Sequence, residues 1–65
     1  MAGIACGDRV KLEVQVGYRE AGERGLVLEV SETQAVVQFD RRDTYGAAVE
    51  VVRVDLLDRV EREEN

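Results

Sequence analysis

The sequence predicts a small all-β domain, a partly open barrel of five short strands with one 3₁₀ turn before the last strand. Three observations lead to this prediction. Twelve of the 65 residues are valine, and β-branched side chains fit pleated sheets better than helices. Residues 9–16 alternate strictly between polar and apolar, which is the period of a half-buried strand. Two further apolar segments, 25–30 and 35–40, are separated by a short polar connection, as expected for a hairpin.

A chain of this length has room for a single domain, residues 1–65, with a core at about 7–61 and a frayed tail at 62–65. Such a small domain buries only about 60% of the surface that its unfolded chain exposes. Additional stability usually comes from a metal, disulfides, a partner or sheet closure. The sequence has no His and one Cys, which excludes a His-containing zinc site and an internal disulfide. We therefore expect closure of the sheet or self-association.

Breaks in the alternating pattern separate the elements. Glycines and charged residues interrupt it after Val16 and after Asp40, so a long loop is expected at each place. Asp55 is expected to cap the 3₁₀ turn with its carboxylate, and Leu57 to close one end of the barrel. The predicted order is a strand at 9–16, a loop at 17–24, strands at 25–30 and 35–40, a loop at 41–46, a strand at 47–54, a 3₁₀ turn at 55–58 and a strand at 59–61.

The apolar residues are too numerous to share one small interior. The set expected inside is Val10, Leu12, Val14, Val16, Val27, Val30, Val37, Phe39, Val49 and Val51. The set expected at an oligomer interface is Leu26, Leu28, Val36, Val52 and Val54. An exposed aliphatic patch usually marks an interface, so we expect a homo-oligomer or an obligate partner. The apolar positions change parity between Val51 and Val52, which indicates either a bulge or a strand buried on both faces.

Several short motifs are spread over most of the chain. They are Gly7-Asp8-Arg9-Val10, Gly25-Leu26-Val27, Val37-Gln38-Phe39-Asp40, and Leu57 followed by Val60. Together they resemble a five-stranded SH3-like barrel over about residues 7–61, and most closely the KOW-type domain of NusG-like transcription factors and ribosomal proteins. The resemblance implies that Gly25 matches the near-fixed glycine of that family. It also implies binding to RNA or to other proteins, although this chain is more acidic than the RNA-binding members.

A second resemblance lies in residues 49–60. Their pattern of strand and turn is similar to the end of plasmid-type (type II) dihydrofolate reductases, which are also SH3-like barrels and build one active pore from four subunits. In that family the strand carries a Gln-Ile-Tyr triplet that lines the pore. The matching positions here are Glu50, Val51 and Val52, which lack the amide and the phenol. A multimeric pore enzyme is therefore the third functional alternative.

The side chains favour a non-catalytic protein. With no His, the usual general base near neutral pH is missing. Cys6 lies beside Asp8, a neighbour that raises the pKa of a thiol, so we favour a partly buried small residue over a reactive thiol. Gly22 to Gly25 are not followed by a helix pattern that would hold a phosphate. Asp40 and Asp43 are read as a solvated loop rather than a cation site. We predict no catalytic residue, cofactor or metal.

The two long loops carry the residues expected to bind a partner. In SH3-like barrels the loops after the first and third strands often lie near one another, and Tyr and Arg are enriched at interface hot spots. The alternative is that both tyrosines cover the barrel ends while the arginines pair with Glu20, Glu23, Asp40 and Asp43. The candidate partner-binding residues are Tyr18, Arg19, Arg24, Arg41, Arg42 and Tyr45.

Charge and composition bear on the partner and the compartment. The net charge of −5 disfavours nucleic acid, because phosphate-binding domains normally carry a basic excess. No apolar segment approaches the roughly 20 residues that cross a bilayer, and the start of the chain lacks the features of a signal peptide. One cysteine agrees with a reducing compartment. We expect a cytoplasmic module that binds a protein partner or itself, with RNA as the alternative and no membrane.

Overall fold

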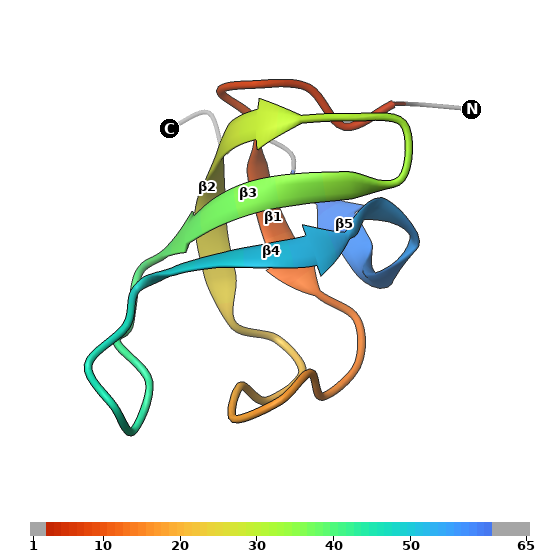
Figure 1. The fold of residues 1–65 in the computed structure, drawn as a ribbon. Coiled ribbons are helices and arrows are strands. Elements are labelled where there is room, and N and C mark those ends of the chain that lie inside the picture. The colour runs from red at the N-terminus through yellow and green to blue at the C-terminus, as the bar shows by residue number, and fades with distance from the viewer. Residues whose placement is uncertain (1–2, 61–65) are drawn as a thin grey trace, which may run out of the picture.

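The computed structural model describes residues 3–60 and consists of one five-stranded antiparallel sheet (Figure 1). The strands lie in the order β4-β3-β2-β1-β5. Within the described residues there is no α-helix, so the all-β prediction with a 3₁₀ turn before the last strand is confirmed. Closure into a barrel stays a prediction, and the tail predicted at 62–65 lies outside the described residues. The elements are β1 (Arg9–Leu12), β2 (Arg24–Val30), β3 (Gln34–Phe39), β4 (Val49–Arg53), η1 (Val54–Leu56) and β5 (Leu57–Arg59).

One face of the sheet forms the hydrophobic core. Successive side chains of a strand point to opposite faces, and β3 follows this rule, with Ala35, Val37 and Phe39 buried between exposed or half-buried neighbours. Five residues predicted to lie inside do so: Val10, Leu12, Val27, Val37 and Phe39. The full core is Val10, Leu12, Val27, Ala35, Val37, Phe39, Val52 and Leu57.

The first strand is shorter than the alternating pattern predicts. β1 ends at Leu12, and the backbone N–H of the next residue, Glu13, makes one further bond on the β5 side, to the carbonyl of Leu56 at 2.9 Å. The chain bends at this point, so Val14 is exposed and Val16 is only half-buried. The prediction that Val14 lies inside is therefore wrong.

The faces of β4 are opposite to the prediction. Val52 is 3% exposed and belongs to the core, whereas Val49 and Val51 are 49% and 58% exposed on the outer face. The register between β3 and β4 is regular from Gln34–Arg53 to Gln38–Val49, so no bulge is present there. Because both sets of alternate positions are apolar, hydrophobicity alone does not choose between the faces. Val52 is therefore removed from the predicted oligomer interface.

The bulge lies in β2. The pairing of β2 with β3 shifts between Val27 and Glu29, which leaves Leu28 as the additional residue. The end of β2 is correspondingly more open than predicted, and Val30 is exposed rather than inside.

The turn before the last strand begins one residue and ends two residues earlier than predicted. Arg53 is its N-cap and makes no side-chain cap hydrogen bond, so the prediction that Asp55 caps the turn is wrong. Asp55 instead accepts a hydrogen bond from Arg53 Nη2 at 2.9 Å. Leu57 is buried at the start of β5, and its predicted role in closing one end of a barrel stays a prediction.

A glycine is required at position 25, where β2 pairs with β3. It is buried and pairs with Phe39. A Cβ atom built on Gly25 would lie 2.7 Å from the carbonyl oxygen of Gln38 and 2.9 Å from Cα of Phe39. Contacts this short with backbone atoms require the two strands to separate. The glycine therefore permits the close approach of β2 and β3 on which the core packing depends.

We expect Gly25→Ala to lower the free energy of unfolding by about 1–3 kcal/mol, the usual range for overpacking a core. Gly3→Ala is the matched control, because a Cβ at Gly3 has no atom within 4 Å and that glycine does not adopt a positive φ. Urea unfolding of both variants measures the difference. Equal stability of the two variants would contradict the close-contact argument.

Candidate functional site

The side chain that organises the two long loops is Arg19. It is 1% exposed and is the only charged residue that is buried in the described part of the chain. Its Nε donates to Glu50 Oε2 at 2.7 Å and its Nη1 to Glu23 Oε1 at 2.9 Å. Two carbonyl oxygens, those of Arg41 and Ala47, accept from Nη1 and Nη2 at 2.6 and 2.7 Å. All three guanidinium nitrogens are thus hydrogen-bonded inside the protein.

A tight turn directs Arg19 inward. Val16 and Arg19 exchange two backbone hydrogen bonds of 2.9 and 2.8 Å around the two residues Gly17 and Tyr18. Gly17 adopts φ of +57°, which a residue with a Cβ rarely adopts, so glycine suits the first central position of this hairpin turn. The turn leaves Tyr18 at its tip, exposed to solvent, and returns Arg19 beneath it.

The buried guanidinium lies over the aromatic ring of Phe39, a core residue. Its Cζ atom is 4.2 Å from the centroid of the Phe39 ring, a distance at which a cation is attracted to the negative face of the ring. Phe39 ends β3, just before the β3–β4 loop. Arg19 therefore joins the polar network of the loops to the hydrophobic core of the sheet.

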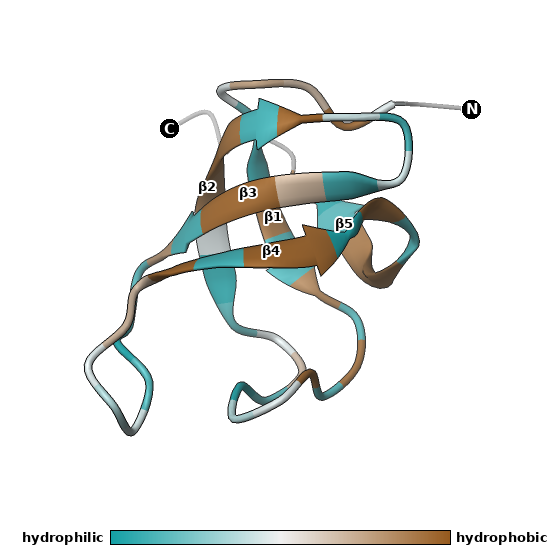
Figure 2. Cartoon of the chain, in the orientation of Figure 1, coloured by the Kyte–Doolittle hydropathy of each residue, from teal (hydrophilic) through white to brown (hydrophobic). Residues whose placement is uncertain are grey.

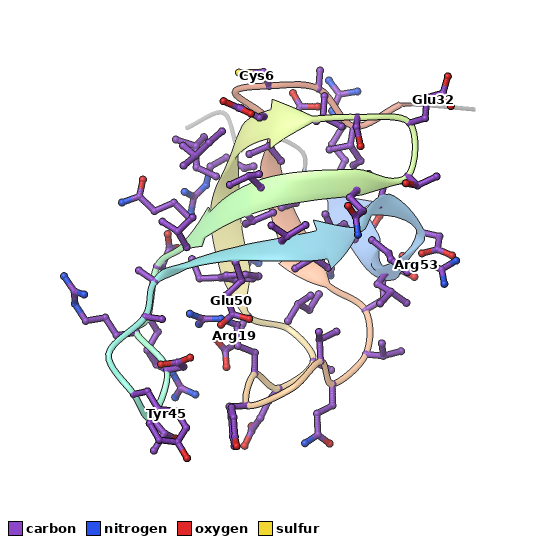
Figure 3. The ribbon with its side chains drawn as sticks, in the orientation of Figure 1. Cys6, Arg19, Glu32, Tyr45, Glu50 and Arg53 are labelled. Carbon is purple, nitrogen blue, oxygen red and sulfur yellow. The ribbon has the colours of Figure 1, made fainter. Side chains whose placement is uncertain are left out.

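Arg19 holds together segments that are distant in the sequence. The β1–β2 loop supplies Arg19 and Glu23, the β3–β4 loop supplies the carbonyls of Arg41 and Ala47, and β4 supplies Glu50. Both loops extend from the same end of the sheet (Figure 1), and Arg19 and Glu50 meet beneath β4 (Figure 3). The expectation that the loops after the first and third strands lie together is met by this network.

Glu23 is the carboxylate shared by the two loops. It pairs with Arg19 at 2.9 Å and with Arg41 at 3.0 Å, and it accepts the backbone N–H of Glu20 at 3.0 Å. Burial alone would raise the pKa of Glu23. The hydrogen bonds from Glu20 and Arg19, together with the positive charge of Arg41, outweigh that effect and lower the pKa of this carboxyl below its ordinary value of 4.5.

Asp43 holds the β3–β4 loop by accepting hydrogen bonds from the backbone of that loop. Its Oδ1 accepts the backbone N–H groups of Tyr45 at 2.8 Å and Ala47 at 2.9 Å. These hydrogen bonds, the one from Ala47 first, lower the pKa of the Asp43 carboxyl below 3.8 despite partial burial. Asp40 is engaged elsewhere, in a 2.7 Å pair with Arg9. Within residues 3–60 no group of three or more His, Cys, Asp or Glu side chains could hold a metal ion.

The tips of the two loops meet through Tyr18 and Tyr45. Their ring centroids are 5.2 Å apart with an interplanar angle of 73°, an edge-to-face contact. Even so, Tyr18 is 64% exposed and Tyr45 75% exposed. Rings this exposed do not cover the ends of the sheet, which was the alternative expectation for Tyr18 and Tyr45. We call Tyr18 and Tyr45 the tyrosine pair.

The arginines predicted to bind a partner occupy different environments. Arg19 is inside the protein, so its assignment to a partner-binding surface is corrected to a structural role. Arg41 pairs with Glu23 but remains 70% exposed, and Arg42 donates to the carbonyl of Gly46 at 2.8 Å from an exposed position. Arg24 opens β2 next to the buried Gly25 and is exposed. The alternative expectation was that the loop arginines pair with acidic residues. This holds for Arg19 and Arg41, which both pair with Glu23.

The residues predicted for self-association also divide. Leu26, Leu28 and Val36 are half-buried, whereas Val54 in η1 packs against the core. The most exposed aliphatic side chains of β4, Val49 and Val51, were assigned to the interior. In Figure 2, β4 is hydrophobic along most of its length, with one hydrophilic segment in its first half. The sequence feature that could have identified the outward valines is Glu50, which lies between them. Glu50 points inward to pair with Arg19, so its two neighbours in the strand point outward.

Cys6 is exposed in the segment before β1, not partly buried as expected. Its Sγ donates to the carbonyl of Leu28 at 3.0 Å. Within the described residues no helix has the length and apolar character needed to span a membrane.

Comparison of the chain with protein-family models, curated proteins and solved structures finds no match. The function is therefore inferred from the residues and their geometry.

We expect Arg19→Met to lower the free energy of unfolding by about 3 kcal/mol, because it leaves two carboxylates without their buried partner. The variant should also lose the nuclear Overhauser contact between the rings of the tyrosine pair. Arg53→Met is the control: it removes an exposed pair with Asp55 and should cost about 1 kcal/mol or less. Similar losses in both variants would contradict the role given to Arg19.

Acid should weaken the two loops. Glu23 and Asp43 have lowered pKa values in the folded chain, so at low pH the unfolded chain binds more protons. Their stabilising contribution is complete above the ordinary values of 4.5 and 3.8 and is lost as the pH falls through the lower folded values. Thermal unfolding between pH 7 and pH 2 should show a shallower acid loss in Glu23→Gln and Asp43→Asn than in the original chain.

The control for this pH series is Glu32→Gln, which removes one negative charge from the exposed β2–β3 turn. Its pH profile should follow that of the original chain. If all three variants flatten the profile equally, net charge rather than the loop hydrogen bonds causes the acid loss.

Proposed function

We propose that this chain is a non-catalytic protein-binding module, and that the tyrosine pair is the centre of its ligand surface. The observation that supports the proposal is the exposure of two large aromatic rings on loops tied together by an arginine whose three guanidinium nitrogens are all hydrogen-bonded. Tyrosine combines a large apolar ring with a hydroxyl and loses little conformational freedom on binding. A surface of this kind is suited to a protein ligand.

Preorganisation supports the same function. Ordering a mobile loop on binding subtracts from affinity. Here the turn at Gly17 and the hydrogen bonds of Asp43 already hold the backbone that carries each tyrosine. Arg41 and Arg42 are exposed in the same loop as Tyr45 and offer cations at the rim of the surface. A partner with an apolar centre and acidic periphery fits this arrangement.

The strand order and the 3₁₀ turn before β5 support the further proposal that the sheet is an SH3-like barrel. We propose a cytoplasmic location, consistent with a single cysteine and no disulfide. The pore-enzyme alternative is weakened by Glu50, since its carboxylate is occupied by Arg19. The proposal therefore assigns no catalytic residue.

RNA is the second candidate, because exposed tyrosines next to arginines can also stack on bases. Two features weigh against it. The net charge of the chain is −5, and Arg19, one of the four candidate arginines, is buried. RNA binding would weaken steeply with added salt, since it depends on phosphate contacts.

The test compares the original chain with Tyr18→Ala, Tyr45→Ala and the control Arg53→Ala as baits for partners in extracts of the source cells. We expect a protein partner that survives nuclease and raised salt, and at least a tenfold weaker capture by either tyrosine variant. Because the chain has no Trp and only these two tyrosines, the fluorescence of the purified chain should change when that partner binds. Both tyrosine variants should remain folded by circular dichroism.

Capture that is equal in all variants would overturn the assignment of the tyrosine pair. Capture that disappears with nuclease or with raised salt would favour RNA instead.

A further inference from the structure

We propose that two copies of the chain pair through their β4 strands, antiparallel and about a two-fold axis at Val51. This inference is independent of the tyrosine pair, and it specifies how the self-association expected from the aliphatic outer residues takes place. It rests on three observations: the edge position of β4, the exposure of its valines and the arrangement of its charges.

The two edges of the sheet differ in their protection. β5 is one edge, and it is only three residues long with exposed Asp58 and Arg59. Short, charged edge strands resist pairing with other chains. β4 is the other edge, and it carries three valines with no proline or lysine. It is therefore the edge that is open to a further strand.

The backbone of β4 presents alternate residues to the open edge. Phe39 N–H donates to the carbonyl of Ala48 at 2.7 Å, and Val54 N–H to that of Thr33 at 2.9 Å. Hydrogen-bonded and non-hydrogen-bonded pairs alternate along an antiparallel ladder, so Glu50 and Val52 bond toward β3. The N–H and C=O groups of Val49 and Val51 point outward, as does the N–H of Arg53, whose carbonyl belongs to η1 as that of its N-cap residue. Among residues 3–60, the outward groups of Val49 and Val51 and the N–H of Arg53 have no hydrogen-bond partner.

Glu50 would ordinarily protect this edge. A charge pointing into the sheet from an edge strand disfavours addition of another strand. In this chain the Glu50 carboxylate is bound to Arg19 at 2.7 Å, so its charge is already compensated. The one inward charge of β4 therefore does not oppose pairing.

Charge and hydrogen bonding select one register. An axis at Val51 places Val49 opposite Arg53 of the second copy and Val51 opposite Val51 of the second copy. The outward groups of the two Val51 residues then bond to each other, and the N–H of each Arg53 donates to the carbonyl of Val49 in the other copy. An axis at Glu50 would oppose two carboxylates on the same face, and an axis at Val52 would oppose Val49 to Asp55, which lies in η1. Like charges placed directly opposite destabilise a sheet. The axis at Val51 is the register without these defects.

The same register extends an apolar row across the dimer. Val36 already pairs with Val51 on the outer face, and the axis at Val51 continues this row into Val51 and Val36 of the second copy. Cross-strand pairs of β-branched residues contribute to sheet stability. A two-fold pairing is also closed, so association stops at the dimer. Because one strand pair buries a small area, we expect a weak dimer whose population rises with concentration.

Val51→Pro is the decisive variant. It removes only an outward N–H, and proline is tolerated on an edge strand whose N–H faces solvent. We expect the original chain to dimerise with increasing concentration in sedimentation equilibrium, with slower amide exchange at Val51 and Arg53. Val51→Pro should be monomeric at every concentration and keep its circular dichroism spectrum. Val51→Lys, a charge on the edge, serves the same purpose if the proline variant does not fold.

The matched control is Val36→Lys, on the same outer face but on the interior strand β3. Pairing at the edge should persist in this variant with at most a few-fold weakening, whereas face-to-face stacking would be abolished. A monomeric original chain, a dimer that survives both Val51 variants, or a dimer lost in Val36→Lys would each overturn the proposal.

Partner capture distinguishes this inference from the proposed function. Val51→Pro should still capture the protein partner, and Tyr18→Ala should still dimerise. Loss of capture in Val51→Pro would mean that the two surfaces are one.

Discussion

The burial of Arg19 is the constraint on which the loops of this protein depend. Removing a guanidinium from water is costly unless its donors find partners in the interior. The partners here are two carboxylates and two backbone carbonyls that come from three separate segments. Those segments must take up their positions together, since the absence of one would leave a charge or a donor unsatisfied. The loops are therefore ordered by a polar network, and the sheet by its apolar core, with Phe39 in contact with both.

The burial of Arg19 also determines which side chains are exposed at the loop tips. Tyr18 lies at the tip of the two-residue turn, next to Arg19. Because the Arg19 side chain points into the protein, the Tyr18 side chain is left at the surface. Asp43 does the equivalent for Tyr45 by accepting backbone N–H groups on both sides of the tip. The exposed pair is thus a consequence of polar groups that are satisfied beneath it. This separation of an ordered polar support from an exposed aromatic surface is what a recognition site requires.

The fold was largely predictable from the sequence because its strands carry a clear period of two. Val10, Leu12, Val37 and Phe39 have polar residues between them, so one face is specified. In β4, valines occupy both sets of alternate positions, and hydrophobicity did not specify the face. The loop tyrosines were predicted as a candidate surface, but the burial of Arg19 was not. Arginine is almost never fully buried unless paired, and although one partner, Glu23, is near in the sequence, the other, Glu50, lies far along the chain.

Glu50 connects the two surfaces that we propose. Its inward orientation follows from the pair with Arg19, and by strand alternation it turns Val49 and Val51 outward and Val52 into the core. The register of the valines is thus set by a charge rather than by their own hydrophobicity. The same ion pair ties the loops of the tyrosine pair to β4 and removes the charge that would have protected the β4 edge. One buried arginine therefore supports the proposed ligand surface at the loop tips and makes the proposed pairing edge compatible with a second copy.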